Sequence, residues 1–328
     1  MFKGDKILLK KRTIKESNIS VSFTDKDIVF KDSVNAIKFN STNRNYLEYI
    51  YNTIVSKIFT YFQYITSSSW GVYYPEIHKS EYLSFPFVEP SENYQSILND
   101  LFKKLISPLE SFYSNESGKN NIDFELNHLK PIIDSFLINQ NVLDKINNII
   151  NNIYDVKEHE KDLIDYTLNV SRYQFQESKQ DYVTSFEKYG RNKDEILKHY
   201  AEVYLQEFSE IYSDEYIQVE IFPLEHFIAM NFVNKKEKPK DTVIYSEDKN
   251  AESVLRTLAN SLSISEVVST SNPSKNIYIQ KDIKGFEEDS FYVIKPNEYK
   301  CWHRAMAWYD VAEFKEAIQQ AELDEFYT

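Results

Sequence analysis

The first forty residues alternate apolar and polar positions in short runs, which is the pattern of strands with one buried face. Asp and Asn residues, which favour turns, stand between the runs. The runs are Ile7 to Leu9, Ile19 to Phe23, Ile28 to Phe30 and Val34 to Phe39. We therefore expect a small sheet in this part of the chain.

The spacing changes to a helical period from Tyr46 to Tyr64, where apolar residues recur every three or four positions. Further helices are expected from Glu89 to Lys104, from Asn127 to Tyr154 and from Glu158 to Gln176. The dense asparagines between Asn147 and Asn152 lower intrinsic helicity, so we expect tertiary packing to hold that helix.

Residues 177–194 are polar and charged, and we expect them to form a linker between domains. Beyond them, helical and strand-like segments alternate. The expected helices are 196–211, 251–262 and 311–323, and the expected strands are 217–222, 227–233, 242–245, 276–279 and 290–294. The fold class predicted is α+β. Its parts are a strand-plus-helix region (1–90), a helical segment (91–176), the linker (177–194) and a C-terminal α+β domain (195–328).

The charge balance limits what the chain can bind alone. Its 328 residues include 38 Lys and Arg against 51 Asp and Glu, a formal net charge of -13. A protein that binds DNA unaided is usually basic, because phosphate neutralisation and counterion release supply most of the affinity. Residues 1–45, however, hold 10 basic against 5 acidic side chains. Any nucleic-acid contact is expected there, with a basic partner; the acidic remainder also fits a solvated surface.

Cysteine, glycine and apolar content exclude several classes of protein. The single cysteine, Cys301, excludes a disulfide framework and a multi-cysteine zinc module, and five glycines argue against a Gly-rich nucleotide loop. No apolar run reaches the length of a membrane span, and residues 1–15 lack the apolar core of a secretory signal. We expect a cytoplasmic protein without a cofactor or a membrane partner.

A hydroxyl-rich loop is the most distinctive segment. The run from Phe59 to His78 passes from an aromatic helix end into a series of hydroxyl residues and then into a Trp-Gly turn. Hydroxyl and backbone donors beside an indole suit contact with phosphates and bases. The segment resembles the start of the target-recognition part of bacterial adenine-specific DNA methyltransferases from restriction-modification and defence systems. The matching residues are Thr66, Ser67, Ser68, Ser69, Trp70, Gly71, Glu76, Leu83 and Pro86.

The resemblance is clearest over residues 1–90 and implies a target-recognition region without its enzyme. Methyltransferases of this family bind the methyl donor on a Gly-rich loop and hold the target amine with an Asn-Pro-Pro-Tyr type tetrapeptide. Neither motif is present. The nearest string, Asn272 to Lys275, lacks the second proline and the aromatic residue that stacks on a flipped base, so we interpret it as a turn. The resemblance therefore implies a non-catalytic chain that works in trans with a separate methyltransferase subunit.

A second constellation follows the strand expected at 290–294. Lys300, Trp302, His303 and Arg304 lie together, with Trp308 and Tyr309 one helical turn beyond. Aromatic residues interleaved with cations are typical of surfaces that stack a base or contact a phosphate backbone. The same residues at a strand-to-helix joint are also typical of the hydrophobic anchor of a last helix. Both interpretations stay open at this stage.

Other catalytic chemistry has weak support. A metal-dependent nuclease needs an acidic residue on one strand and Glu-x-Lys on its neighbour. Asp241 with Glu247 to Lys249 has these residue types, but both ends belong to one short segment. Cys301 and His303 lack a third ligand or an orienting carboxylate nearby in sequence. The remaining histidines show no metal-ligand spacing, so no metal site is expected.

The function that we predict is target recognition or scaffolding in a DNA-modification or anti-phage defence complex, with DNA and a methyltransferase subunit as partners. The candidate contacts are Lys10, Lys11 and Arg12 together with residues 66–71. An alternative for the three basic residues is protection of an edge strand by charge. An alternative for the whole chain is an acidic regulator or DNA mimic that occupies a basic groove of another subunit. A nuclease with an unfamiliar site is a third hypothesis.

Overall fold

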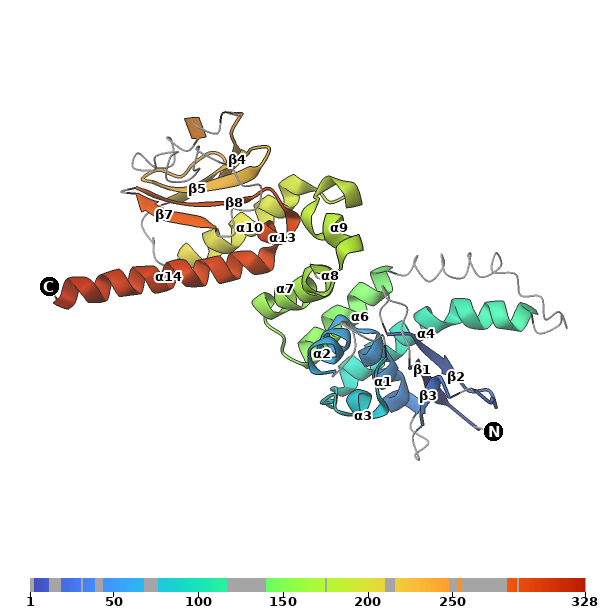
Figure 1. The fold of residues 1–328 in the computed structure, drawn as a ribbon. Coiled ribbons are helices and arrows are strands. Elements are labelled where there is room, and N and C mark those ends of the chain that lie inside the picture. The colour runs from blue at the N-terminus through green and yellow to red at the C-terminus, as the bar shows by residue number, and fades with distance from the viewer. Residues whose placement is uncertain are drawn as a thin grey trace. The chain divides into compact units, whose positions relative to one another are not determined.

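A computed structural model of the chain has two compact units, Met1–Leu168 (unit 1) and Asn169–Thr328 (unit 2). The structure describes residues 3–11, 19–30, 32–38, 44–67, 76–116, 140–174, 176–209, 216–247, 250, 253–254, 282–287 and 289–327, without the side chains of 108–116 and 321–327. Figure 1 shows the ribbon, and each unit is described by itself.

Unit 1 contains a three-stranded antiparallel sheet formed by β1 (Lys6–Lys10), β2 (Val21–Thr24) and β3 (Val34–Ile37). The strand order is β2-β1-β3, so β1 is the central strand and hydrogen-bonds on both sides. Ile7 and Leu9 of β1 are buried, as the alternating pattern predicts.

Unit 1 also contains the helices α1 (Arg44–Val55), α2 (Lys57–Thr66), α3 (Lys79–Leu83), α4 (Glu92–Glu116), α6 (Gln140–Ile153) and α7 (Glu158–Tyr166). Helices α1 and α4 pack against the sheet, and α2 and α6 pack against α1. The ring of Tyr51 on α1 meets Phe102 of α4 edge-to-face at 5.2 Å between centroids. The Asn52 side-chain amide donates to the backbone carbonyl of Leu98, at 2.9 Å, which ties α1 to α4 inside the core.

The helix expected over residues 46–64 is interrupted at Ser56, where α1 ends and α2 begins. The Ser56 hydroxyl donates to the carbonyl of Thr53, at 2.6 Å, and accepts from the backbone N–H of Phe59. A serine in this position accepts a hydrogen bond from a backbone N–H at the helix N-terminus, which would otherwise be buried without a partner. The apolar period continues across the break, which is why the sequence alone predicts one helix.

Residues 177–194, expected as a linker, fold into short helical turns within unit 2. The turns are η2 (Glu177–Lys179), α9 (Gln180–Thr184) and η3 (Glu187–Tyr189). The Arg191 guanidinium lies 3.7 Å from the centroid of the Tyr299 ring and donates to the Ser185 carbonyl at 2.9 Å. The division between the units instead falls after Leu168, within a π-helical segment, η1 (Thr167–Ser171), which is followed by α8 (Arg172–Gln174).

Unit 2 is built on a five-stranded sheet in the order β6-β4-β5-β8-β7. Its strands are β4 (Tyr216–Pro223), β5 (Phe227–Lys235), β6 (Val243–Tyr245), β7 (Ile283–Glu287) and β8 (Ser290–Pro296). All pairs are antiparallel except β4 with β6. Two long helices, α10 (Lys193–Phe208) and α14 (Arg304–Tyr327), lie along one face of this sheet, and α13 (Tyr299–Trp302) precedes α14 (Figure 1). The α+β fold class is confirmed.

Aromatic rings fill the layer between this sheet and the two helices. Tyr204 of α10 stacks on Phe232 of β5 at 4.3 Å between centroids, and Phe232 stacks on Phe291 of β8 at 4.7 Å. Phe314 of α14 meets Phe291 at 5.1 Å. Rings of this size contribute large buried apolar areas, and the stacked geometry adds to the area contribution.

A buried ionic cluster lies beside the aromatic layer. Asp310 of α14 is fully buried and pairs with Lys295 of β8, which is also fully buried. The Tyr200 hydroxyl of α10 donates to the same carboxylate, and the Lys284 ammonium of β7 lies 2.6 Å from its other oxygen. Burial, followed by the nearby Tyr204 and Asp310, raises the pKa of Tyr200 well above its usual value, so Tyr200 is a neutral donor.

We predict that Lys295→Met or Asp310→Leu, made singly, lowers the free energy of unfolding by about 3–5 kcal/mol, because each leaves a buried charge without its fully buried partner. Among the described residues, Asp310 then keeps only Lys284 as an ion-pair partner, and Lys295 keeps only the partly exposed Asp282 at 3.2 Å. The double variant is expected to lose less than the sum of the two losses, since it removes both charges together. Urea unfolding followed by circular dichroism measures this. Lys315→Met is the matched control: Lys315 of α14 pairs with Glu207 of α10 at 2.6 Å, but both side chains are partly exposed. This control variant should lower the free energy of unfolding by about 0–1 kcal/mol. If the double variant loses as much free energy of unfolding as the two single variants together, the prediction is wrong.

Candidate nucleic-acid interface

The end of β1 and the segment that contains α3 lie against each other, although more than sixty residues separate them in sequence. The backbone N–H of Ile77 donates to the Lys11 carbonyl at 3.0 Å, and the Tyr82 hydroxyl donates to the Lys10 carbonyl at 3.2 Å. Ile77 and Tyr82 are buried. These contacts fix the backbone of Lys10 and Lys11 next to α3.

The carboxyl end of α2 is joined to the same place. The Ser67 hydroxyl donates to a Glu81 carboxylate oxygen at 3.0 Å, and the Gln63 side-chain amide donates to the Glu81 carbonyl at 3.1 Å. The Thr66 hydroxyl donates back to the carbonyl of Phe62 at 2.7 Å. The structure therefore brings Lys10, Lys11, Thr66 and Ser67 together around α3, but both hydroxyls take part in hydrogen bonds within the protein.

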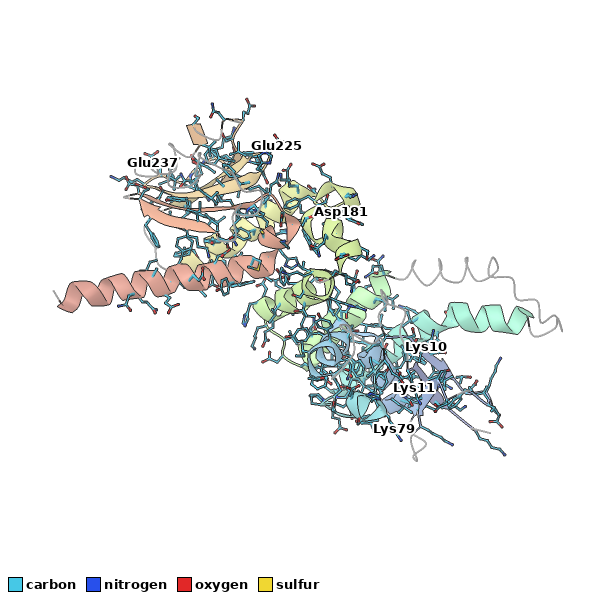
Figure 2. All side chains as sticks on the ribbon, viewed as in Figure 1. Lys10, Lys11, Lys79, Asp181, Glu225 and Glu237 are labelled. Carbon is cyan, nitrogen blue, oxygen red and sulfur yellow. The ribbon has the colours of Figure 1, made fainter. Side chains whose placement is uncertain are left out.

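Three lysines form the cationic part of this region, which we call the amino-terminal basic surface: Lys10, Lys11 and Lys79. Lys10 and Lys79 are exposed, and Lys11 is partly exposed. Figure 2 shows all three in unit 1. Lys79 is the first residue of α3 and was not predicted from the sequence as a site residue. Only the hydrogen bond between residues 11 and 77 brings Lys79 beside Lys10 and Lys11.

Two carboxylates reduce the positive charge of this surface only in part. Asp32 pairs with Lys11 at 2.9 Å, and the Asp32 side chain is fully exposed. Such solvent-exposed pairs contribute little, so a phosphate can replace Asp32 at small cost. Glu81 is held by Ser67 and by the His78 backbone N–H, at 2.6 Å, in a capping box at the start of α3. Glu81 therefore has a structural role.

The structure excludes one interpretation of the basic residues at the end of β1. Lys10 lies in the central strand, paired with Val34 of β3, and its backbone N–H donates to the Ser20 carbonyl at 3.0 Å. Charges that protect a sheet edge belong on edge strands. Edge protection therefore does not explain Lys10 and Lys11. Arg12, Ser68, Ser69, Trp70 and Gly71 lie outside the described residues.

Trp302 and His303 of the second constellation belong to the core of unit 2, whereas Trp308 is partly exposed and Tyr309 is exposed. Trp302 is fully buried, donates its indole N–H to the Pro296 carbonyl at 2.9 Å, and meets Tyr200 at 4.9 Å between ring centroids. His303 is also buried, and its Nδ1 accepts from the backbone N–H of Ala305 at 3.2 Å, at the start of α14. A base cannot stack on Trp302 in this fold. These positions fit the interpretation of a hydrophobic anchor for the last helix and not that of a nucleic-acid contact.

The cations of that constellation have partners nearby. Lys300 pairs with Glu298 at 2.8 Å, and the Arg304 guanidinium lies 5.8 Å from the centroid of the Trp308 ring. Both residues belong to unit 2, whereas the amino-terminal basic surface belongs to unit 1. The residues predicted from the sequence therefore fall into two separate groups.

Metal chemistry finds no support in the described part of the chain, where no three His, Cys, Asp or Glu residues are grouped so that they could hold an ion. Asp241, considered for a nuclease, follows the loop after β5, and its backbone carbonyl accepts from the Gln218 side chain at 2.9 Å. Glu247 is described, whereas Asp248 and Lys249 are not. Across the helices that the structure describes, none has the length and apolar character needed to cross a membrane.

Comparison with known proteins adds no relative. No protein-family model, no curated protein and no solved structure matches this chain. The resemblance to methyltransferase target-recognition regions therefore stays a prediction from the sequence motif. Functional inference for this chain depends on the geometry and charge of its own residues.

Cys301 gives a direct test of the packing around α13, because it is the only cysteine of the chain. Burial, and secondly the neighbouring Glu298, raise the pKa of the Cys301 thiol to about 11. A raised pKa means that the thiol stays protonated at pH 8, and the thiolate is the reactive form. We expect iodoacetamide to label the folded protein about 100-fold more slowly than the urea-unfolded protein, from a shift of about two pKa units. Equal rates in the folded and unfolded states would show that Cys301 is not packed as described.

Proposed function

We propose that this chain is a non-catalytic subunit of a DNA-modification or anti-phage defence complex, in which it contacts duplex DNA through the amino-terminal basic surface. Lys10, Lys11 and Lys79 contact backbone phosphates. A separate methyltransferase subunit supplies catalysis and further positive charge. The resemblance of residues 66–86 to methyltransferase target-recognition regions supports the choice of complex.

The observation that carries this proposal is the position of Lys10 and Lys11 at the end of a central strand, beside the start of α3. Their backbones are fixed by hydrogen bonds from Ile77 and Tyr82, while the Lys10 and Lys79 side chains reach solvent. Lysines on a fixed backbone bind phosphate with a smaller loss of conformational entropy than lysines on a loose segment. Since edge protection does not explain these lysines, phosphate contact is the interpretation that we favour.

The net charge explains why a partner is part of the proposal. Residues 1–168 carry 19 basic against 22 acidic side chains, a formal net charge of -3, and residues 169–328 carry 19 against 29, a net charge of -10. Long-range repulsion from the acidic unit opposes association of the isolated chain with DNA. A basic companion subunit that covers part of unit 2 would remove this repulsion. We therefore place DNA binding in the assembled complex.

The proposal predicts that Lys10→Gln, Lys11→Gln and Lys79→Gln together weaken duplex binding by the complex purified with its companion subunits. Each lost phosphate contact lowers the magnitude of the slope of log affinity against log salt by about 0.9. The slope of the triple variant should therefore be smaller in magnitude by about 2.7. Fluorescence anisotropy of a labelled duplex, between about 50 and 200 mM salt, measures the slope.

The control variant changes three exposed lysines of unit 1 helices by the same charge: Lys103→Gln, Lys145→Gln and Lys161→Gln. Its salt slope should equal that of the unchanged complex. If the two triple variants behave alike, general charge and not this surface governs binding. If neither variant changes the slope, the proposed contact is wrong.

The acidity of unit 2 favours a second candidate function, an acidic regulator that occupies a basic groove of another subunit. Asp181, Glu225 and Glu237 are exposed carboxylates of this unit (Figure 2). Acidic surfaces of this kind can compete with DNA for a basic groove. Under this alternative, duplex DNA displaces the chain from its companion subunit. Under the first proposal, the chain, its companion and DNA form one ternary complex.

A further inference from the structure

A run of lysines begins at the last residue of β5 and stands out against the acidity of unit 2. Lys235, Lys236, Lys238 and Lys240 are four of the unit's 19 basic residues and lie within six positions. We call residues 235–240 the lysine loop. It joins β5 to β6, which lie on either side of β4 in the sheet.

The ammonium groups of this loop are available to a ligand. Lys236, Lys238 and Lys240 are exposed, and Lys235 is partly exposed. Among the described residues, no carboxylate lies within the 4.0 Å of an ion pair from any of the four ammonium groups. Glu237 is within the loop, and Asp241 follows it directly. The loop itself therefore carries four positive charges against one negative charge.

Both ends of the loop are held by the sheet. Before it, the backbone N–H of Asn234 donates to the Asp289 carbonyl at 2.9 Å. After it, the Asp241 carbonyl accepts from the Gln218 side chain at 2.9 Å, and the Thr242 carbonyl accepts from the Val219 backbone at 2.8 Å. Pro239 restricts φ within the loop. These constraints limit the conformations from which the lysines contact a ligand.

An exposed aromatic ring lies beside the loop. Tyr216 is the first residue of β4 and pairs with Lys235 of β5 in the antiparallel register. Tyr216 is 44% exposed. An aromatic residue beside a row of cations is the combination with which proteins bind single-stranded nucleic acids, since the ring stacks on a base and the cations follow the backbone.

We propose that the lysine loop and Tyr216 form a second nucleic-acid contact of this chain, specific for single strands. The lysines bind successive phosphates, and Tyr216 stacks on an unpaired base. The loop offers no large apolar side chain that could insert into a lipid bilayer, which favours nucleic acid over an anionic membrane. This contact belongs to unit 2 and does not depend on the duplex contact proposed for unit 1.

The test uses the complex purified with its companion subunits and a fluorescein-labelled oligo(dT) strand of about 16 nucleotides, the upper range of site sizes for single-strand-binding folds. Lys236→Gln with Lys238→Gln should lower the salt slope of binding by about 1.4, which is about 0.7 for each lost single-strand contact. Tyr216→Ala should raise the Kd about fivefold or more, whereas Tyr216→Phe should not, because stacking needs the ring and not the hydroxyl.

The matched control is Lys188→Gln with Lys198→Gln, two exposed lysines of the same unit with the same change of charge. It should leave the slope unchanged. The inference is overturned if the loop and control variants bind alike, or if the loop variants lose affinity only for phosphatidylserine vesicles. The variant at Lys10, Lys11 and Lys79, measured with the same strand, should keep loop-dependent binding. If the lysine loop proves not to bind single strands, the proposed duplex contact of unit 1 is not affected. If the duplex contact proves wrong, the proposal for the lysine loop is likewise not affected.

Discussion

Four elements meet on the carboxylate of Asp310, and the architecture of unit 2 depends on this contact. Strands β7 and β8 and helix α14 lie close together in the sequence, whereas α10 lies about a hundred residues earlier. Tyr200 comes from α10, Lys284 from β7, Lys295 from β8 and Asp310 itself from α14. A buried carboxylate without partners would cost several kcal/mol, so each partner restricts where the others can lie. The aromatic layer supplies apolar burial, whereas the ionic cluster joins α14 to β7 and β8 through the carboxylate of Asp310.

The lysines of the chain illustrate how burial separates structural from binding roles. Lys295 is fully buried on Asp310, and Lys6 is fully buried with its ammonium donating to the Lys26 carbonyl at 2.6 Å. These charges are compensated inside the fold and are not available to a ligand. Lys10 and Lys79, in contrast, project from a backbone fixed by hydrogen bonds, and the lysine loop projects from two fixed strands. In an acidic protein, such few and well-positioned cations are the places where a polyanion can bind.

Local patterns predicted much of the fold, and contacts between distant residues account for the rest. Period-two alternation located β1 and β4, and short apolar runs located β5 and β8, whose central residues are buried on both faces. Both are local patterns that need no distant information. Strand β7 was missed because Gly285 weakens its pattern; a Cβ at this position would collide with the Tyr292 ring across the sheet. The burial of Trp302 depends on Tyr200, about a hundred residues away, so sequence alone left both interpretations open. Lys79 joins the basic surface only through the distant contact between Ile77 and Lys11.

We propose that Lys10, Lys11 and Lys79 contact DNA in the assembled complex. Quantitative mass spectrometry of lysine acetylation, with and without duplex DNA, tests it directly at each residue. Acetylation of these three lysines should slow when DNA is added, while Lys103, Lys145 and Lys161 react at an unchanged rate. If DNA binds and the acetylation of Lys10, Lys11 and Lys79 stays unchanged, these lysines do not contact DNA.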